Sequence, residues 1–298
     1  MTEKRLFWRE FWSLWSAGVI TSAIFAVLVR IPTTPLATLL LLRGHSEKPL
    51  LVGTEAIEIP LELAIAVSCG LLAAHRIGLG APIVEKWLRG EPIKSDVRSS
   101  IVPSLIVAVL LAVISLLPSL PMFHPNRQLA HQEAERISES PAGANLNEKL
   151  GRFAGERLTS ASLTFSYLSS AIRGELIGRL FFVSGIALIL AKTTSTSSGS
   201  ASNRILFSAV LAVAAIDAIL YLVWQSSASH MVYSSLRLTK NVHDPFWVVA
   251  VRACLQTVPG AVGFGWLYVR RGIESAMLCA FVASTLAHVM FFVAIRIA

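Results

Sequence analysis

Long apolar runs alternate with short polar segments along most of the chain. A helix needs about 20 mainly apolar residues to cross the hydrocarbon core of a bilayer, and these runs have that length. The pattern therefore predicts an all-α fold, a polytopic membrane helix bundle with about seven transmembrane helices. The predicted spans are Phe11–Val29, Ile57–Ala74, Ile101–Leu117, Ala161–Leu190, Ile205–Trp224, Phe246–Tyr268 and Ile273–Ile295.

Two segments between the spans have a pattern of their own. Leu36–Leu42 is apolar but too short to cross a bilayer, which is typical of an interfacial or re-entrant segment. Residues 122–159 form a polar segment, and apolar residues recur in it at roughly helical spacing, as in an amphipathic helix lying at the interface. No stretch without a span is long enough for a separate soluble domain, so residues 1–298 are expected to form a single membrane domain.

Composition supports a membrane protein. Hydrophobic residues make up 54% of the chain, charged residues 15%, and the mean hydropathy is +0.64. The net charge of +8 is interpreted as basic loops that meet anionic lipid headgroups rather than as a nucleic-acid surface. Because the three cysteines lie in apolar segments without C-x-x-C spacing, neither a disulfide framework nor a thiolate metal site is indicated.

Short basic loops predict the orientation. With the N-terminus in the cytoplasm, the basic loop from Arg76 to Arg98, the Ser/Thr-rich linker after Leu190 and the Arg270–Arg271 turn also lie inside. Lys and Arg counted over all loops are nearly equal on the two sides, so this orientation depends on the short loops alone.

Ionisable residues within the fourth span are the main functional signal. The stretch RGELIGRLFFVSGIALIL holds Arg173, Glu175 and Arg179, and a charge at the bilayer centre costs roughly 2.5–3.5 kcal/mol even on the lenient insertion scale. These side chains are therefore expected to face the interior of the bundle. Glu175 and Arg179 are four residues apart, which on a helix permits an ion pair. Either the pair only balances buried charge, or it belongs to a polar site at membrane depth.

Three stretches of the chain have recognisable motifs: FGWLYVRRGIESAMLCAFVASTLAH from Phe264 to His288, GELIGRLFF from Gly174 to Phe182, and IGLGAPIVEKWLRGEP from Ile77 to Pro92. They resemble the CAAX protease and bacteriocin-processing (CPBP, abortive-infection) family of intramembrane proteases. The first is similar to the late motif segment of that family, the second to its hallmark segment, and the third to a loop of bacterial members. The resemblance implies a CPBP-like core at about 160–295, N-terminal helices at 11–118, and a location in a bacterial-type cell inner membrane.

The resemblance also implies a site that is largely lost. In the family, two adjacent glutamates activate a water for peptide hydrolysis, and later histidines with an Asn or Asp polarise the scissile carbonyl. Here Gly174 stands at the first glutamate, whereas Glu175 and Arg179 are retained. By this alignment the family's Phe falls on Leu211, its two histidines fall on Ala215 and Ala280, and its Asn or Asp falls on Ser284, with His288 one turn further on.

Two functional hypotheses follow. In the first, the chain is a catalytically degenerate protease homologue that binds a membrane segment, peptide or lipid in the inherited cavity. Its partners are then the lipid bilayer and a membrane peptide or protein, with no nucleic acid. The alternative is an active CAAX-type endopeptidase, a hydrolase with Glu175 as base.

The candidate residues divide by role. The catalytic candidates are Glu175, its ion-pair partner Arg179, and His288. The binding candidates are Arg173, Asp217 and Ser284. No cofactor is expected; the alternative is a divalent metal held by Glu175, Asp217 and His288. The competing interpretation is that Arg173, Arg179 and Arg252 only balance Glu175 and Asp217. A small transporter is not favoured, because no internal repeat is visible.

Overall fold

The computed structural model describes residues 3–29, 48–119, 160–194, 201–236 and 245–297, and its regular elements are all helical. The predicted interfacial or re-entrant segment at 36–42 and the polar segment at 122–159 lie outside these residues. The helices are α1 (Glu3–Val29), α3 (Lys48–Ile77), α4 (Pro82–Arg89), α5 (Lys94–Ile114), a 3₁₀ turn (Leu117–Ser119), α8 (Ser160–Glu175), η3 (Leu176–Val183), α9 (Ser184–Thr193), α10 (Asn203–Leu236), α11 (Phe246–Arg271) and α12 (Ile273–Ile297).

Six helical stretches in the described residues are long and apolar enough to cross a membrane. They lie in α3, in α5, in the continuous run from α8 through α9, and in α10, α11 and α12, which confirms the predicted all-α polytopic bundle. The predicted first span is also a helix, α1, but it is not among the six. Its N-terminal half carries Arg9 and Glu10 between aromatic residues, which lowers the mean hydropathy of its described part.

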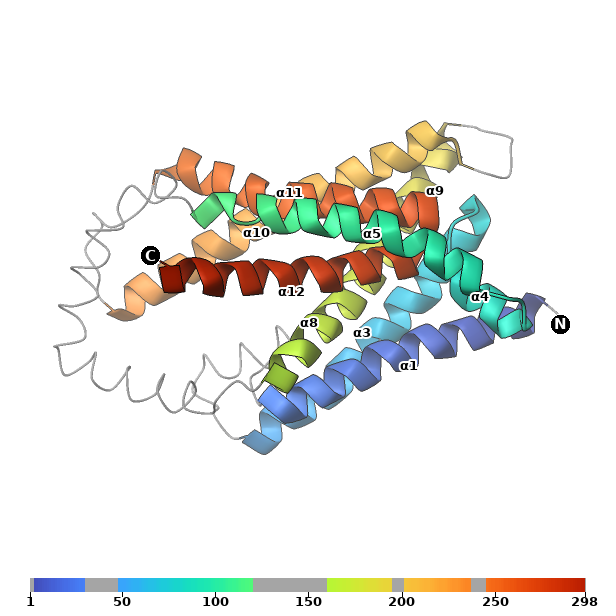
Figure 1. The fold of residues 1–298 in the computed structure, drawn as a ribbon, viewed down its shortest axis with the longest axis horizontal. Helices are drawn as coiled ribbons and strands as arrows, with labels where there is room; N and C mark the ends of the chain where they lie inside the picture. Colours follow the sequence, from blue (N-terminus) through green and yellow to red (C-terminus); the bar gives the residue numbers. More distant parts are fainter. Residues whose placement is uncertain (1–2, 30–47, 120–159, 195–200, 237–244, 298) are drawn as a thin grey trace.

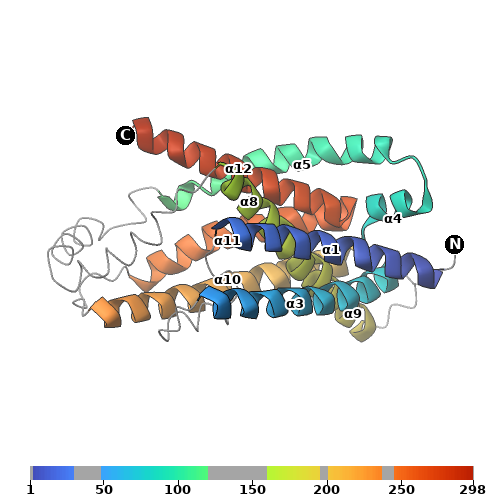
Figure 2. The same cartoon turned by 90° about the horizontal axis from the view of Figure 1, so that it is seen from below.

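Successive long helices run in alternating directions (Figure 1), so α1 begins at one end of the bundle and α12 ends at the other. The end at which α1 begins also holds the short helix α4 and the turn between α11 and α12, and it is called the α4 end below. Figure 2 shows α5 and α12 along one side of the bundle and α3 and α10 along the other, with α8 crossing between them. Most described Lys and Arg side chains lie at the α4 end: Lys4, Arg5, Arg9, Arg76, Lys86, Arg89, Lys94, Arg98, Lys192, Arg204, Arg270 and Arg271.

The core forms where α3 packs against η3. Leu63, Val67 and Leu71 of α3 are fully buried, as are Leu176 and Leu180 of η3. A side chain at Gly70 would place a Cβ 2.7 Å from the carbonyl oxygen of Leu180, so only glycine allows this approach. Small residues permit such close packing of membrane helices, where apolar contact with lipid gives no hydrophobic advantage to association.

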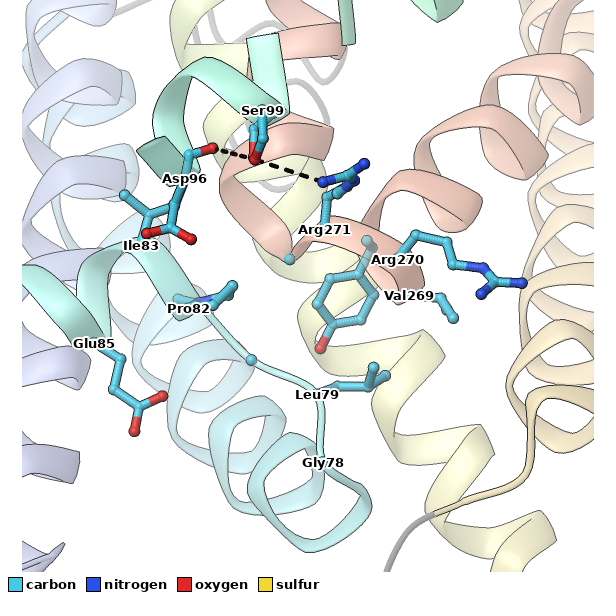
Figure 3. Close-up of a pocket in the computed structure, with 15 residues that line it drawn as sticks. Gly78, Leu79, Pro82, Ile83, Glu85, Asp96, Ser99, Val269, Arg270 and Arg271 are labelled. Carbon is cyan, nitrogen blue, oxygen red and sulfur yellow. Dashed lines mark hydrogen bonds between the residues drawn. The ribbon is translucent and has the colours of Figure 1, made fainter. Parts of the chain in front are cut away.

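The α4 end brings together the loop after α3 and the turn between α11 and α12. The Glu274 carboxylate at the start of α12 accepts hydrogen bonds from the backbone amides of Ile83 and Val84, at 2.9 and 2.8 Å, and so caps α4. The amide of Ile273 donates to the carbonyl oxygen of Gly80 at 3.2 Å. A partly open pocket of about 350 Å³ lies here. Figure 3 shows Arg271 reaching toward Ser99 beside it. This junction fixes the ends of α3 and α11 relative to each other.

Candidate functional site

The helix that carries the central charges changes its winding next to them. Glu175 is the last residue of α8, and the next eight residues, LIGRLFFV, form the π-helical segment η3. A π-helical turn has hydrogen bonds from residue i to i+5, so it shifts the residues after it around the helix axis, and such segments are frequent at functional sites. The wider turn buries Leu176, Arg179, Leu180 and Val183 together.

Glu175 and Arg179 form a buried ion pair. The Nε atom of Arg179 lies 3.3 Å from the Oε2 atom of Glu175, and the two side chains are 9% and 4% exposed, in that order. The guanidinium also donates to the carbonyl oxygen of Gly260 on α11 at 3.5 Å, and it lies 5.3 Å from the centre of the Phe264 ring, within cation–π range. Contacts on two helices therefore fix the position of the guanidinium.

An open groove of about 450 Å³ runs between η3, α10 and α11, with Arg179 among the residues that line it. Asp217 of α10 lies near enough to interact electrostatically with the same guanidinium as Glu175 does. The Tyr221 hydroxyl donates a hydrogen bond to Oε1 of Gln256 across the groove. The polar lining residues are Arg179, Asp217, Tyr221, Gln256 and Thr257.

Glu175 itself does not line the groove. It is 3% exposed and lies behind Arg179 as seen from the groove, with its Oε2 atom buried. Both carboxylates, Glu175 and Asp217, thus act on the Arg179 guanidinium. The groove therefore combines one cation with a nearby carboxylate and several neutral donors and acceptors, and it is not strongly positive.

Arg173, predicted as a binding residue, has its partner on another helix. Its guanidinium forms an ion pair with Glu62 of α3, and the Arg173 side chain is 16% exposed. Arg173 therefore balances the charge of Glu62. The charge-balance interpretation had instead paired Arg173 with Glu175 or Asp217. Neither member of this pair lines the groove.

His288 lies apart from the charged cluster. Its ring packs against Tyr167 of α8, with 5.4 Å between the ring centres. Tyr167 precedes Glu175 by eight residues, or about 12 Å along a helix at roughly 1.5 Å per residue. The predicted convergence of Glu175, Asp217 and His288 is therefore wrong for the histidine. Within the described residues, no group of three or more His, Cys, Asp or Glu side chains is placed to hold a metal ion.

The positions to which the resemblance assigns lost catalytic residues are mostly directed outward. Gly174 is exposed, and no other atom lies within 4 Å of the Cβ that a side chain would add there. Ala215 and Ser284 are also exposed, and only Ala280 is buried. Ser284, predicted as a binding residue, does not line the groove.

Sequence reasoning missed the polar partners that complete these sites: Glu62, Tyr221 and Gln256. A signal was present for the last two. Tyr221 follows Asp217 by four residues, and Gln256 follows Arg252 by four, so each extends a polar stripe along one face of its helix. Arg252 is near enough to Tyr221 to interact with it electrostatically, which places the two stripes opposite each other.

Comparisons with models of protein families, with curated proteins and with solved structures gave no match to this chain. The composition and the apolar helices nevertheless identify the class of protein to which the chain belongs. The chain is an integral membrane protein with a helical bundle that carries a buried ion pair beside a polar groove.

Proposed function

We propose that this chain is a divergent, catalytically inactive relative of the CPBP intramembrane proteases that binds a peptide segment in the groove beside Arg179. The observation that carries the proposal is the polar groove itself, at membrane depth and lined by Arg179, Asp217 and Gln256. Polar side chains inside a membrane are costly and mark functional sites by default. The resemblance of Gly174–Phe182 and Phe264–His288 to that family supports a peptide as the ligand.

The chemistry of the lining favours a peptide over an anionic lipid. A peptide backbone at membrane depth has amide and carbonyl groups that need hydrogen-bond partners, because the surrounding lipid chains offer none. Gln256, Thr257 and Tyr221 offer both donors and acceptors. The positive charge of Arg179 is offset by Glu175 and Asp217, so a phosphate group would gain little net attraction. Phe264 and Leu220 supply apolar contacts for a ligand side chain.

The burial of Glu175 argues against peptide hydrolysis. A general base must lie within hydrogen-bond reach of the water that it activates, and this carboxylate faces Arg179 instead of the groove. The residues at the other motif positions, Gly174, Ala215 and Ala280, offer no side-chain donor. Each donor to the oxyanion is worth about 2.7–4 kcal/mol of barrier in well-studied hydrolases, so their loss slows the reaction by several orders of magnitude.

Binding of a fluorescent, farnesylated C-terminal peptide to the protein in lipid nanodiscs tests the proposal. We expect saturable binding that is about 10-fold weaker in the double variant Gln256→Leu, Thr257→Val, since each lost hydrogen bond is worth about 0.5–1.5 kcal/mol. Thr285→Val is the matched control. Both threonine hydroxyls donate to their own helix at 2.8 Å, and only Thr257 lines the groove.

The same samples decide between the two hypotheses. Mass spectrometry of the incubated peptide is expected to find it intact. Cleavage that disappears in Glu175→Gln would replace the proposal with the active-enzyme alternative. Equal affinities for the groove variant and for Thr285→Val would show that the peptide does not bind in the groove. Displacement of the peptide by an anionic lipid at equal concentration would make lipid the ligand.

A further inference from the structure

A second groove, of about 610 Å³, lies at the α4 end between the first turns of α10 and the last turns of α11. It is lined by Asn203, Arg204, Phe207 and Ser208 of α10 and by Trp266 and Arg270 of α11. In Figure 3 the Arg270 side chain extends toward α10, whereas Arg271, one residue later, turns toward Ser99. Arg204 and Arg270 thus come from two helices to one groove.

Both arginines lack an ionic partner within the described residues. Other basic side chains at this end are engaged: Lys86 bonds Asp96, and Arg89 bonds Glu85. For Arg204 and Arg270 the described part of the chain offers neither a hydrogen bond nor a carboxylate within 4 Å. The sequence between Glu175 and Asp217 contains no acidic residue at all, so the linker ahead of α10 cannot supply one. Among the described residues, no carboxylate therefore compensates the two positive charges of the groove.

The walls of the groove carry exposed aromatic side chains. Trp266 is 42% exposed and Phe207 is 46% exposed, and aromatic side chains of this kind gather at the membrane interface. Phe207 and Leu211 are four residues apart on α10, so they continue along one face from the groove toward the bilayer centre. Leu211 is also exposed. A cationic groove thus leads into an apolar track.

We propose that this groove binds the phosphate of an anionic phospholipid in the leaflet at the α4 end, between Arg204 and Arg270, with an acyl chain along Phe207 and Leu211. Guanidinium groups suit phosphate because their planar donors match its oxygens. The apolar track and the interfacial tryptophan favour a lipid over free phosphate. Most of the described basic residues lie at this end, and a leaflet rich in anionic lipid attracts such residues.

Native mass spectrometry of the full chain in detergent tests this, with phosphatidylglycerol as the probe and phosphatidylcholine as its zwitterionic comparison. Each basic residue that meets an anionic lipid contributes about a fivefold increase in binding affinity. The double variant Arg204→Gln, Arg270→Gln should therefore bind phosphatidylglycerol about 25-fold more weakly. The matched control is Lys94→Gln, Arg98→Gln, which removes the same charge from exposed positions on α5 at the same end, outside the groove.

The expected result is preferred binding of phosphatidylglycerol that survives in the α5 control and is lost in the groove variant, with unchanged melting temperatures for both. Equal losses in the two variants would overturn the proposal, because they would show a response to net charge alone. Equal binding of phosphatidylcholine would overturn it as well. Displacement of the lipid by millimolar inorganic phosphate would reassign the groove to a soluble anion.

Discussion

Replacing Arg179 should destabilise the bundle more than replacing Glu175, although the two side chains form one ion pair. Arg179→Met removes a cation that acts on two carboxylates, together with the contacts to Gly260 and Phe264. Breaking a buried pair in this way costs about 3–5 kcal/mol. Glu175→Gln leaves Arg179 with Asp217 and its contacts on α11, so only one of its two carboxylate neighbours is lost, at a cost of about 1–3 kcal/mol.

The double variant should cost about as much as Arg179→Met alone. Once the arginine is gone, Glu175→Gln removes a buried charge that has lost its partner, so the second change costs little. The measurement is the free energy of unfolding in mixed micelles as SDS is added, for the wild type, both single variants and the double variant. A coupling free energy of about 1–3 kcal/mol is expected from the cycle.

The pair of Arg173 and Glu62 supplies the comparison within the same chain. The Glu62 side chain is 37% exposed, so its coupling to Arg173 should be smaller, about 1 kcal/mol or less. The reasoning would be refuted by strictly additive effects at Glu175 and Arg179, or by a larger cost for Glu175→Gln than for Arg179→Met.

Two further predictions concern the junction at the α4 end. Gly272→Ala should lower the melting temperature clearly, because Gly272 has φ +93 and an added Cβ would lie 2.3 Å from Cδ of Pro82. Gly78 also has a positive φ, but no atom lies within 4 Å of an added Cβ, so Gly78→Ala should lower the melting temperature less. Equal losses in the two variants would show that backbone strain alone, and not the contact with Pro82, causes the destabilisation. Glu274→Gln should speed amide hydrogen exchange at Ile83 and Val84, whereas Glu85→Gln should not; unchanged exchange would contradict the capping role.

The membrane helices were largely predictable from the sequence, because a spanning helix needs apolar side chains whatever it packs against. The predicted span at Phe11–Val29 is also a helix, α1, although the six candidate spans in the described residues do not include it. Glu10 of this helix is buried, and its Oε2 atom lies 2.9 Å from Nε2 of His75 on α3. Such a contact depends on the register between two helices, which hydropathy does not contain.

The candidate site was predictable only where it is local. Glu175 and Arg179 lie on one helix, so their spacing alone indicates the pair, and the structure has it. Arg173 and Glu62, or Tyr221 and Gln256, meet only through the packing of different helices. Nothing in LIGRLFFV indicates a π-helical segment. The imidazole of His288 could ligate a metal ion, but the position of His288 on α12 places it beside Tyr167.

The central claim is that Arg179 lies beside a groove that is open at membrane depth, and thiol accessibility tests it most directly. In a chain without its native cysteines, Thr257→Cys would be compared in native membranes with Ile189→Cys, on the outer face of α9, and with Glu91→Cys, in the loop after α4. A charged, water-soluble maleimide should label residue 91 fast, residue 257 more slowly, and residue 189 hardly at all. Residue 257 as unreactive as residue 189 would contradict the account.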